Sequence, residues 1–340
     1  MNYKNFEIKN QQTPFFSSNP TNLHFSYNFP FAAFSFLHDN QFEIFNTNKD
    51  NNIYLIYNDY KTLICYDILS KKIIKILKEI HEDDILSFRH YLKNKSDLLI
   101  TSSRDNSIKL FDISNDWKNI LKIENVGDNN DDEYFPINSV CLLSYNNIDY
   151  IVSSCNLDSY LKIFNLDGKK IKNFGDKIER VNYINYYYDK NNNTCYIITL
   201  SNEVNSFLFE SGKLYKNYYI SEESFIDNYV ISEKNNKINL IFSSKNQILC
   251  FDFIKGDLLY QINLNDDYWL HCICLWNEEY IISGGNDNLV HIINLKEKKE
   301  ELILKGHNNI VYTIMKIKLN EKECLLTHEW GGGKIIMWSN

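Results

Sequence analysis

A segment that recurs at a nearly constant spacing constrains the fold of this chain more than any other feature of its sequence. Each copy contains two or three apolar residues, a hydroxyl, a polar turn, and then alternating apolar residues that end in an aromatic or aliphatic side chain. The clearest copy spans residues 98–112. Successive copies lie 45, 53, 45, 42, 42 and 45 residues apart when they are aligned on these terminal side chains, which are Tyr66, Phe111, Phe164, Phe209, Phe251, Ile293 and Trp338. Seven units at this period predict a repeat architecture.

Each unit is expected to form one antiparallel sheet. Every unit contains four short stretches of alternating apolar and polar residues, and none has an apolar stripe at helical spacing over ten residues. Such a sheet leaves both faces in water when it stands alone, so the units are expected to stack radially. The sequence therefore predicts an all-β fold, a seven-bladed β-propeller of four-stranded antiparallel blades. In the second unit we expect strands at Ile85–Phe88, Leu98–Ser102, Ser107–Phe111 and Asn119–Ile123, and in the first unit an inner strand at Phe31–Leu37.

The two ends of the chain predict how the propeller closes. The sequence ends two residues after Trp338, so the seventh unit is expected to have three strands and to lack an outer fourth. An uncovered sheet edge invites pairing with another chain. Strand-like runs at 5–9 and 23–27 precede the first unit, and one of them is expected to complete the seventh blade. The predicted organisation is an N-terminal closing segment, residues 1–28, and a single propeller domain, residues 29–340.

Several residues keep a fixed phase across the units. His81 precedes Asp105 by 24 residues, and Gly306 and His307 open the last unit. An acidic residue lies six positions before the terminal side chain in four units, and a hydroxyl lies four positions before each acid; the pairs are Thr101 and Asp105, Ser154 and Asp158, Thr199 and Glu203, and Ser283 and Asp287. On these marks the chain, from about Leu23 onward, resembles the WD-repeat β-propeller family. Trp338 alone supplies the family's tryptophan, no Trp-Asp pair occurs, and no subfamily is assigned.

The resemblance implies a hydrogen-bonded network within a blade, built from a His, an Asp, a strand hydroxyl and an aromatic residue. Only the second unit is expected to offer all four types, as His81, Thr101, Asp105 and Phe111. The same types could form a nucleophilic triad. Because they recur in phase through a repeat, a structural role is favoured, and no catalytic residue is predicted.

Composition narrows the classes of partner. The chain has 36 Lys and Arg against 44 Asp and Glu, a net charge of -8, which disfavours direct binding of nucleic acid and of anionic membrane surfaces. Eight cysteines in 340 residues are too few for a disulfide scaffold and read as reduced thiols. The N-terminus lacks the pattern of a secretory signal, so a cytoplasmic or nuclear location is expected.

No motif for a cofactor or a metal ion stands out. The run from His271 to Cys274 has no second Cys/His pair at zinc spacing, and strand alternation would send His271 to the face opposite Cys272 and Cys274. No phosphate-cradling glycine loop or nucleophile elbow is present. We therefore expect neither a cofactor nor a metal.

The connections between strands supply the candidate binding residues. We use the term upper rim for the turns that join the fourth strand of one blade to the first of the next, together with the turns between second and third strands. The acidic run Asp128–Glu133 would lie there as a solvated loop, a calcium site or a contact for a basic peptide. Trp, Tyr and Arg dominate binding hot spots. The predicted partner-binding residues are Arg104, Asp131, Asp132, Tyr134, Tyr268, Trp269 and Trp330, and a second, smaller interface at the opposite rim would use Trp117, Trp276 and residues 186–188.

The sequence thus predicts a non-catalytic scaffold or adaptor that binds other proteins or short peptides within a multiprotein complex. One alternative is a phosphoinositide-binding propeller. The subgroup that this alternative resembles has a Phe-Arg-Arg-Gly signature, whereas Phe88, Arg89 and His90 lack the second Arg and the Gly. The other alternative is a propeller enzyme, which would need acidic residues on inner strands; the expected inner strands at 31–34, 137–140 and 311–314 contain none.

Overall fold

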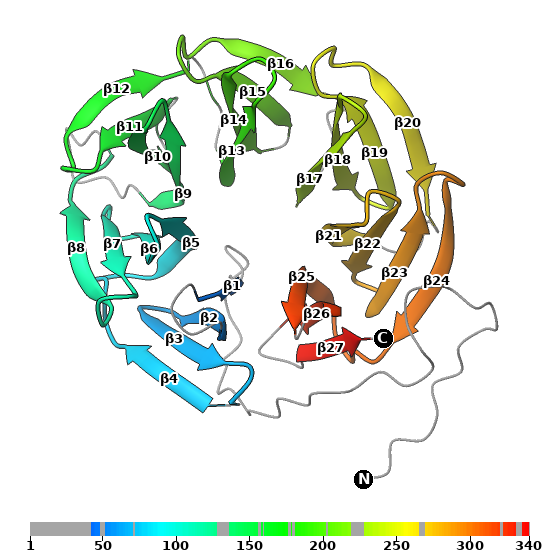
Figure 1. Ribbon diagram of the computed structural model, residues 1–340, viewed down its shortest axis with the longest axis horizontal. Coiled ribbons are helices and arrows are strands. Elements are labelled where there is room, and N and C mark those ends of the chain that lie inside the picture. Colours follow the sequence, from blue (N-terminus) through cyan, green and yellow to red (C-terminus); the bar gives the residue numbers. More distant parts are fainter. Residues whose placement is uncertain are drawn as a thin grey trace. The chain divides into compact units, whose positions relative to one another are not determined.

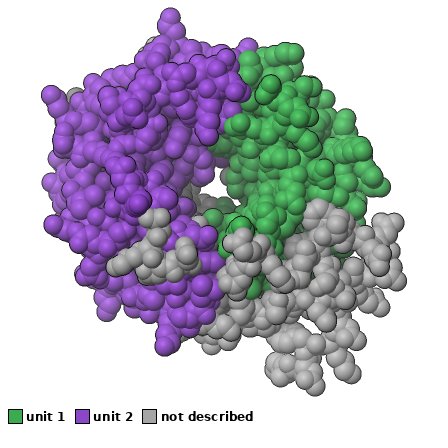
Figure 2. Space-filling model, viewed as in Figure 1, with its two compact units in different colours: residues 1–35, 220–340 green, residues 36–219 purple. Residues whose placement is uncertain are grey.

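A computed structural model describes residues 42–47, 52–70, 72–127, 136–155, 158, 160–175, 178, 181–201, 203–218, 228–264, 269–319, 322–330 and 335–339. These residues form twenty-seven β-strands in seven antiparallel sheets (Figure 1). The chain divides into two compact units, which Figure 2 colours separately. We call residues 36–219 the four-blade unit, and residues 1–35 with 220–340 the three-blade unit.

The four-blade unit contains four sheets, each made of four strands that follow one another in the chain. The first blade contains β1 (Phe42–Asn46), β2 (Ile53–Asp59), β3 (Thr62–Asp67) and β4 (Lys72–Leu77). The second contains β5 (Ile85–Lys93), β6 (Ser96–Ser103), β7 (Ile108–Asp112) and β8 (Lys118–Ile123). The third contains β9 (Ile137–Tyr145), β10 (Ile148–Cys155), β11 (Leu161–Asn165) and β12 (Lys170–Phe174). The fourth contains β13 (Tyr183–Asp189), β14 (Thr194–Leu200), β15 (Val204–Leu208) and β16 (Leu214–Tyr218).

The three-blade unit contains two sheets of four strands and one of three. The fifth blade contains β17 (Tyr229–Lys234), β18 (Lys237–Ser244), β19 (Gln247–Asp252) and β20 (Leu258–Asn263). The sixth contains β21 (Leu270–Trp276), β22 (Tyr280–Gly285), β23 (Leu289–Asn294) and β24 (Lys299–Lys305). The seventh contains β25 (Val311–Leu319), β26 (Lys322–Glu329) and β27 (Ile335–Ser339).

The predicted fold class, an all-β seven-bladed propeller, is confirmed, and in the described part of the chain the seventh blade has three strands as expected. The proposed closing strand in residues 1–28 lies outside the described residues, as do Asp131, Asp132, Tyr134 and Tyr268.

Neighbouring blades within a unit pack face to face. First strands lie side by side, with β9 between β5 and β13 in one unit and β21 between β17 and β25 in the other. The core between the second and third blades shows the pattern: Ile100 and Ile108 of the second blade are fully buried against Val140 and Ile151 of the third. Fourth strands are the most exposed, as in β4, where Ile73, Ile74 and Ile76 reach the surface. Burial therefore distinguishes the inner strands, such as β6, which is buried along almost its whole length, from the outer fourth strands.

Strand pairing corrects the alignment of the fourth unit. In six sheets, the pairing of the third strand with the fourth shifts register immediately before the terminal side chain, and in the fourth blade this residue is Phe207, not Phe209. Both rings are buried, and residues two apart on a strand share a face, so alternation cannot distinguish them. A similar slip affects the third unit, where Ser153 and not Ser154 faces Lys162 across the strands.

The prediction for the first strand is wrong as well. The first sheet begins with β1, Phe42–Asn46, which pairs with β2, whereas the expected strand at 31–37 lies outside the described residues. The sequence favoured 31–37 because that run is apolar except for Ser35, whereas the second residue of β1 is Glu43.

The end of β22 leaves no room for a side chain, which makes Gly285 a test of blade packing. A Cβ atom at Gly285 would lie 2.2 Å from the backbone oxygen of Trp269. Backbone cannot move aside as a flexible side chain can, so we expect Gly285→Ala to cost about 1–3 kcal/mol and to lower the melting temperature by several degrees. Differential scanning fluorimetry measures this. Ser283→Ala on the same strand removes a buried hydroxyl that has no hydrogen-bond partner among the described residues, so it should be neutral or stabilising; equal losses in the two variants would contradict the steric explanation.

Candidate functional site

The second blade contains a buried hydrogen-bonded network centred on His81. His81 lies in the connection between β4 and β5, and its Nε2 is 2.8 Å from Thr101 Oγ1 on β6. Its Nδ1 is 3.0 Å from a carboxylate oxygen of Asp105 and 3.0 Å from Ser107 Oγ. Phe111 packs in the adjoining core and has no polar atom to join the network. The structure therefore brings His81, Thr101 and Asp105 together and places Phe111 nearby.

The charges in this network are settled by burial and hydrogen bonding. Burial lowers the pKa of His81, against the opposing effect of Asp105, so the imidazole is held neutral at pH 7. Burial would raise the pKa of Asp105, but hydrogen bonds from His81 and Ser107 outweigh it and hold that pKa well below its usual range. His81 is 2% exposed and Thr101 is fully buried. Their hydrogen bonds join the β4–β5 connection to the second strand of the blade.

The seventh blade has a network of all four residue types, which corrects the prediction that only the second unit does. His307 Nε2 is 2.6 Å from Thr327 Oγ1, and its Nδ1 is 3.1 Å from Glu329 Oε2. Trp338 Nε1 donates a hydrogen bond to Thr327 Oγ1 at 2.8 Å. Sequence reasoning missed it because Glu329 replaces Asp and follows the His by 22 residues, not 24. The signal was the spacing of 20 residues between His and Thr, which is the same in both units.

In the third and sixth blades, the acid that corresponds to Asp105 pairs with a cationic side chain four residues further along the chain. Asp158 forms a buried ion pair with Lys162 Nζ at 2.8 Å. Asp287 Oδ2 lies 2.9 Å from His291 Nε2, and Glu300 Oε2 lies 2.7 Å from His291 Nδ1. Burial alone would lower the pKa of His291, but the two carboxylates raise it to about 9. An imidazolium between two acids thus replaces the neutral His of the second blade.

Two equivalent threonines test whether the His81 network stabilises the fold. Thr101 and Thr199 are both buried and both face the residue two positions before the terminal aromatic of the third strand. Thr199 Oγ1 has no hydrogen-bond partner among the described residues. We expect Thr101→Val to cost about 1–3 kcal/mol because it leaves His81 Nε2 unpaired, and Thr199→Val to be neutral or stabilising. Calorimetric melting of both variants measures the difference, and similar losses would show that the hydrogen bond to His81 contributes nothing.

The raised pKa of His291 predicts how stability depends on pH. A folded-state pKa of about 9, against an ordinary 6.5, gives stability that is complete below pH 6.5 and is lost as pH rises through about 9. We expect His291→Gln to lower the melting temperature by several degrees at pH 6.5, from a loss of about 2–3 kcal/mol. The gap between variant and wild type should close by pH 9.5. A gap that stays constant over this range would rule out the charged pair as its source.

The predicted residues of the upper rim that the structure describes lie at corresponding ends of their blades. The Arg104 N–H donates to Asp84 O at 2.9 Å, and the Trp330 N–H donates to Ile310 O at 2.8 Å, so both follow the second strand of their blade in the same way. Trp269 immediately precedes β21. Trp269 and Trp330 are 46% and 49% exposed. Arg104 is less accessible and forms an ion pair with Asp84 at 3.3 Å.

The residues expected at the opposite rim do not form an exposed surface. Trp117 is 9% exposed and packs in the core between the first and second blades. Trp276 is 3% exposed and packs between the sixth and seventh. Tyr187 is buried, and Tyr186 and Tyr188 pack partly buried against the core between the third and fourth blades. The prediction of a smaller interface built on these side chains is therefore wrong.

The first strands hold an acid that the sequence interpretation did not include. Glu43 lies on β1, where burial raises its pKa to about 7 against the opposing charge of Arg89. The Arg89 guanidinium on β5 lies 4.0 Å from the centroid of the Tyr183 ring. The expectation that the inner strands contain no acidic residue is therefore corrected: β1 contains Glu43, and the charge opposite it is that of Arg89. Of the nearest match to the phosphoinositide signature, Phe88 is buried, and Arg89 and His90 are partly buried.

The described thiols and acids do not assemble into reactive or metal-binding clusters. All eight cysteines are free, and burial raises the pKa of the Cys141 and Cys195 thiols to about 12. Within the described ranges, no group of three or more His, Cys, Asp and Glu side chains could hold a metal ion.

Comparison with known families agrees with this geometry. Residues 72–112 match the family model of the WD domain, G-beta repeat. The match runs from β4 to the end of β7 and includes His81, Thr101, Asp105 and Phe111. The chain thus contains a WD40 repeat within a seven-bladed propeller fold, a class that typically binds other proteins and is usually non-catalytic. None of the curated proteins compared with the chain matches it. In the part of the chain described by the structure, no helix is long and apolar enough to cross a membrane.

Proposed function

We propose that this protein is a non-catalytic scaffold or adaptor, whose upper rim binds other proteins or short peptides within a multiprotein complex. The observation that carries the proposal is the pair of exposed indoles, Trp269 and Trp330, at the same end of two consecutive blades of the three-blade unit. Trp, Tyr and Arg are the residues enriched at binding hot spots, so two exposed indoles on neighbouring blades are candidate anchors for a partner.

The backbone beneath both indoles is held in place. The Trp269 N–H donates to Asn286 Oδ1 at 2.7 Å, and Trp269 O accepts the Asn286 N–H at 3.1 Å. Trp330 O accepts a hydrogen bond from Asn309 Nδ2 at 3.1 Å. A fixed backbone lowers the entropy lost when a partner is bound. The backbone at Trp269 and Trp330 therefore suits the recognition of a peptide or a protein surface at little ordering cost.

Charge and redox chemistry support the remaining parts of the proposal. The net charge of -8 favours a basic partner, and Arg104, Asp131, Asp132, Tyr134 and Tyr268 remain proposed contacts of the upper rim. Eight free thiols suit a reducing compartment, the cytoplasm or the nucleus. A propeller that binds phosphoinositides is the second candidate, and co-sedimentation with liposomes would test it. The burial of Phe88 and the packing of the partly buried Arg89 against the Tyr183 ring count against it.

Affinity purification from the native cell tests the role of the upper rim. We expect a variant with Arg104, Trp269 and Trp330 replaced by Ala to lose a defined set of partners that the wild type retains, with an unchanged melting temperature. Leu258→Ala is the matched control, because Leu258 is 48% exposed on β20 of the three-blade unit and lies away from the rim turns. Retention of all partners by the triple variant, or equal loss in the control, would refute the assignment of the interface to this rim.

A further inference from the structure

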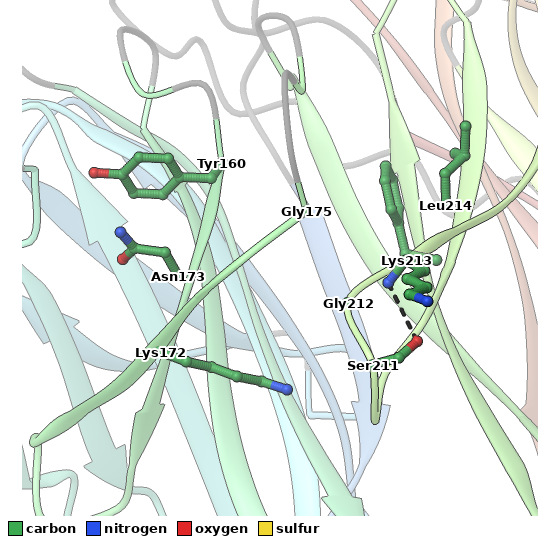
Figure 3. A pocket seen from close by; sticks show the side chains of 9 residues that line it. Tyr160, Lys172, Asn173, Gly175, Ser211, Gly212, Lys213 and Leu214 are labelled. Atoms are coloured by element: carbon green, nitrogen blue, oxygen red, sulfur yellow. Dashed lines mark hydrogen bonds between the residues drawn. The ribbon is translucent and has the colours of Figure 1, made fainter.

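A groove of about 580 Å³ lies between the third and fourth blades of the four-blade unit. One wall comes from the third blade, with Lys172 and Asn173 on β12, and the other from the turn between β15 and β16 with Lys213 (Figure 3). The volume falls in the range of small-molecule and peptide sites. The full lining is Tyr160, Lys172, Asn173, Gly175, Phe207, Ser211, Gly212, Lys213 and Leu214.

The groove is cationic although the chain as a whole is anionic. Its nine lining residues include two lysines and no carboxylate. One lysine projects from each wall, so the two charges come from two different blades. Beyond a Debye length of about 10 Å at 0.1 M salt, the distant acidic residues are screened. An anionic group in the groove would therefore respond to these two ammonium groups more than to the net charge of -8.

Lys172 is held in position before any ligand binds. Its Nζ donates hydrogen bonds to Phe209 O at 3.3 Å and to Glu210 O at 3.1 Å, and lies 5.5 Å from the centroid of the Phe174 ring. In Figure 3 the side chain extends from β12 toward the turn that contains Ser211. An ammonium group has three N–H donors, so one is left for a ligand. Because these contacts already immobilise the Lys172 side chain, a ligand that binds it causes little further loss of side-chain entropy.

Two apolar side chains also line the groove. Phe207 is buried, and Leu214 is 55% exposed. Gly175 and Gly212 adopt φ values of 77° and 72°, the left-handed region in which other residues are strained. A Cβ atom on Gly212 would lie 3.5 Å from the backbone nitrogen of Gly175, so the two glycines bring the two walls of the groove close together.

We propose that this groove binds an extended peptide segment of a protein partner, in which acidic side chains flank an aliphatic residue. The carboxylates would pair with Lys172 and Lys213, and the aliphatic side chain would lie over Phe207 beside Leu214. This site is separate from Trp269 and Trp330, so its test does not depend on the role of the upper rim. A long polyanion such as nucleic acid is disfavoured because it would extend beyond two lysines into the field of an acidic protein.

Selective isotope labelling of glycine gives a direct readout in the full-length chain. The sequence has eleven glycines, and Phe174–Gly175 is its only Phe-Gly pair, so ¹³C-carbonyl Phe with ¹⁵N-Gly identifies that signal. Labelled Ser identifies Gly212 and Gly284, of which Gly284 belongs to the three-blade unit. The probe is the peptide acetyl-Glu-Asp-Leu-Asp-Glu-amide, and the control peptide is its neutral isostere acetyl-Gln-Asn-Leu-Asn-Gln-amide. We expect the acidic peptide to move Gly175 and Gly212 saturably, while Gly284 stays in place and the neutral peptide has no effect.

Charge variants make the outcome decisive. Lys213→Glu alters an exposed residue, and we expect it to weaken binding of the acidic peptide about tenfold or more. Lys172→Gln should weaken binding as well. Lys170→Gln is the matched control, because Lys170 is exposed on the same strand as Lys172 but does not line the groove. The proposal is overturned by unmoved glycine signals, by equal responses to the two peptides, or by equal effects of Lys213→Glu and Lys170→Gln.

Discussion

Face-to-face packing of neighbouring sheets is the interaction on which the rest of this structure depends. Each buried cluster in the described part of the chain combines residues of two consecutive blades, so no blade completes its core alone. A register slip of one residue would turn every apolar side chain to the wrong face, and it would lose this burial. A slip of two residues keeps the face. Selection for packing therefore fixes the alternation of each strand and leaves the connecting turns free to vary.

A second constraint is charge compensation: the acidic side chains buried near these turns each need a hydrogen-bond donor or a positive charge beside them. In the second blade Asp105 is satisfied by His81 from the preceding connection, and in the seventh Glu329 is satisfied by His307. In the third and sixth blades the partner comes from the third strand of the same blade: Lys162 pairs with Asp158, and His291 pairs with Asp287. The requirement is for a donor or a positive charge beside the acid. Where no His reaches the strand hydroxyl, the hydroxyls of Ser153, Thr199 and Ser283 have no hydrogen-bond partner within the described ranges, at a cost of about 1–3 kcal/mol each.

Face-to-face packing and charge compensation explain which parts of the fold could be predicted from the sequence. The period and the alternation report face-to-face packing directly, so the all-β seven-bladed fold and the strands of the second unit were predictable. The terminal side chain of the fourth unit was not, because Phe207 and Phe209 are both buried and share a face. The strand β1 was missed because Glu43 interrupts its apolar pattern, and its counter-charge comes from Arg89 on another blade. Such compensation depends on contacts between blades and leaves no local signal in the chain.

For the candidate site, the sequence predicted where a residue lies in its blade but not whether its side chain is exposed. Trp269 and Trp330 could be placed at the upper rim because their position follows from the repeat. Trp117 and Trp276 were assigned from the same repeat, yet both are buried, because Trp276 is the last residue of β21 and packs between two blades and Trp117 packs in the core between the first and second blades. Exposure is thus decided by packing and not by position in the repeat.

Net charge is a similarly incomplete guide to partners. A value of -8 describes the field far from the protein, whereas binding is decided within about 10 Å, where individual side chains dominate. Lys172 and Lys213 come from blades that the sequence separates by about forty residues, so their convergence follows only from the stacking of the two sheets. The same stacking that fixes the core therefore creates a cationic groove on an acidic protein.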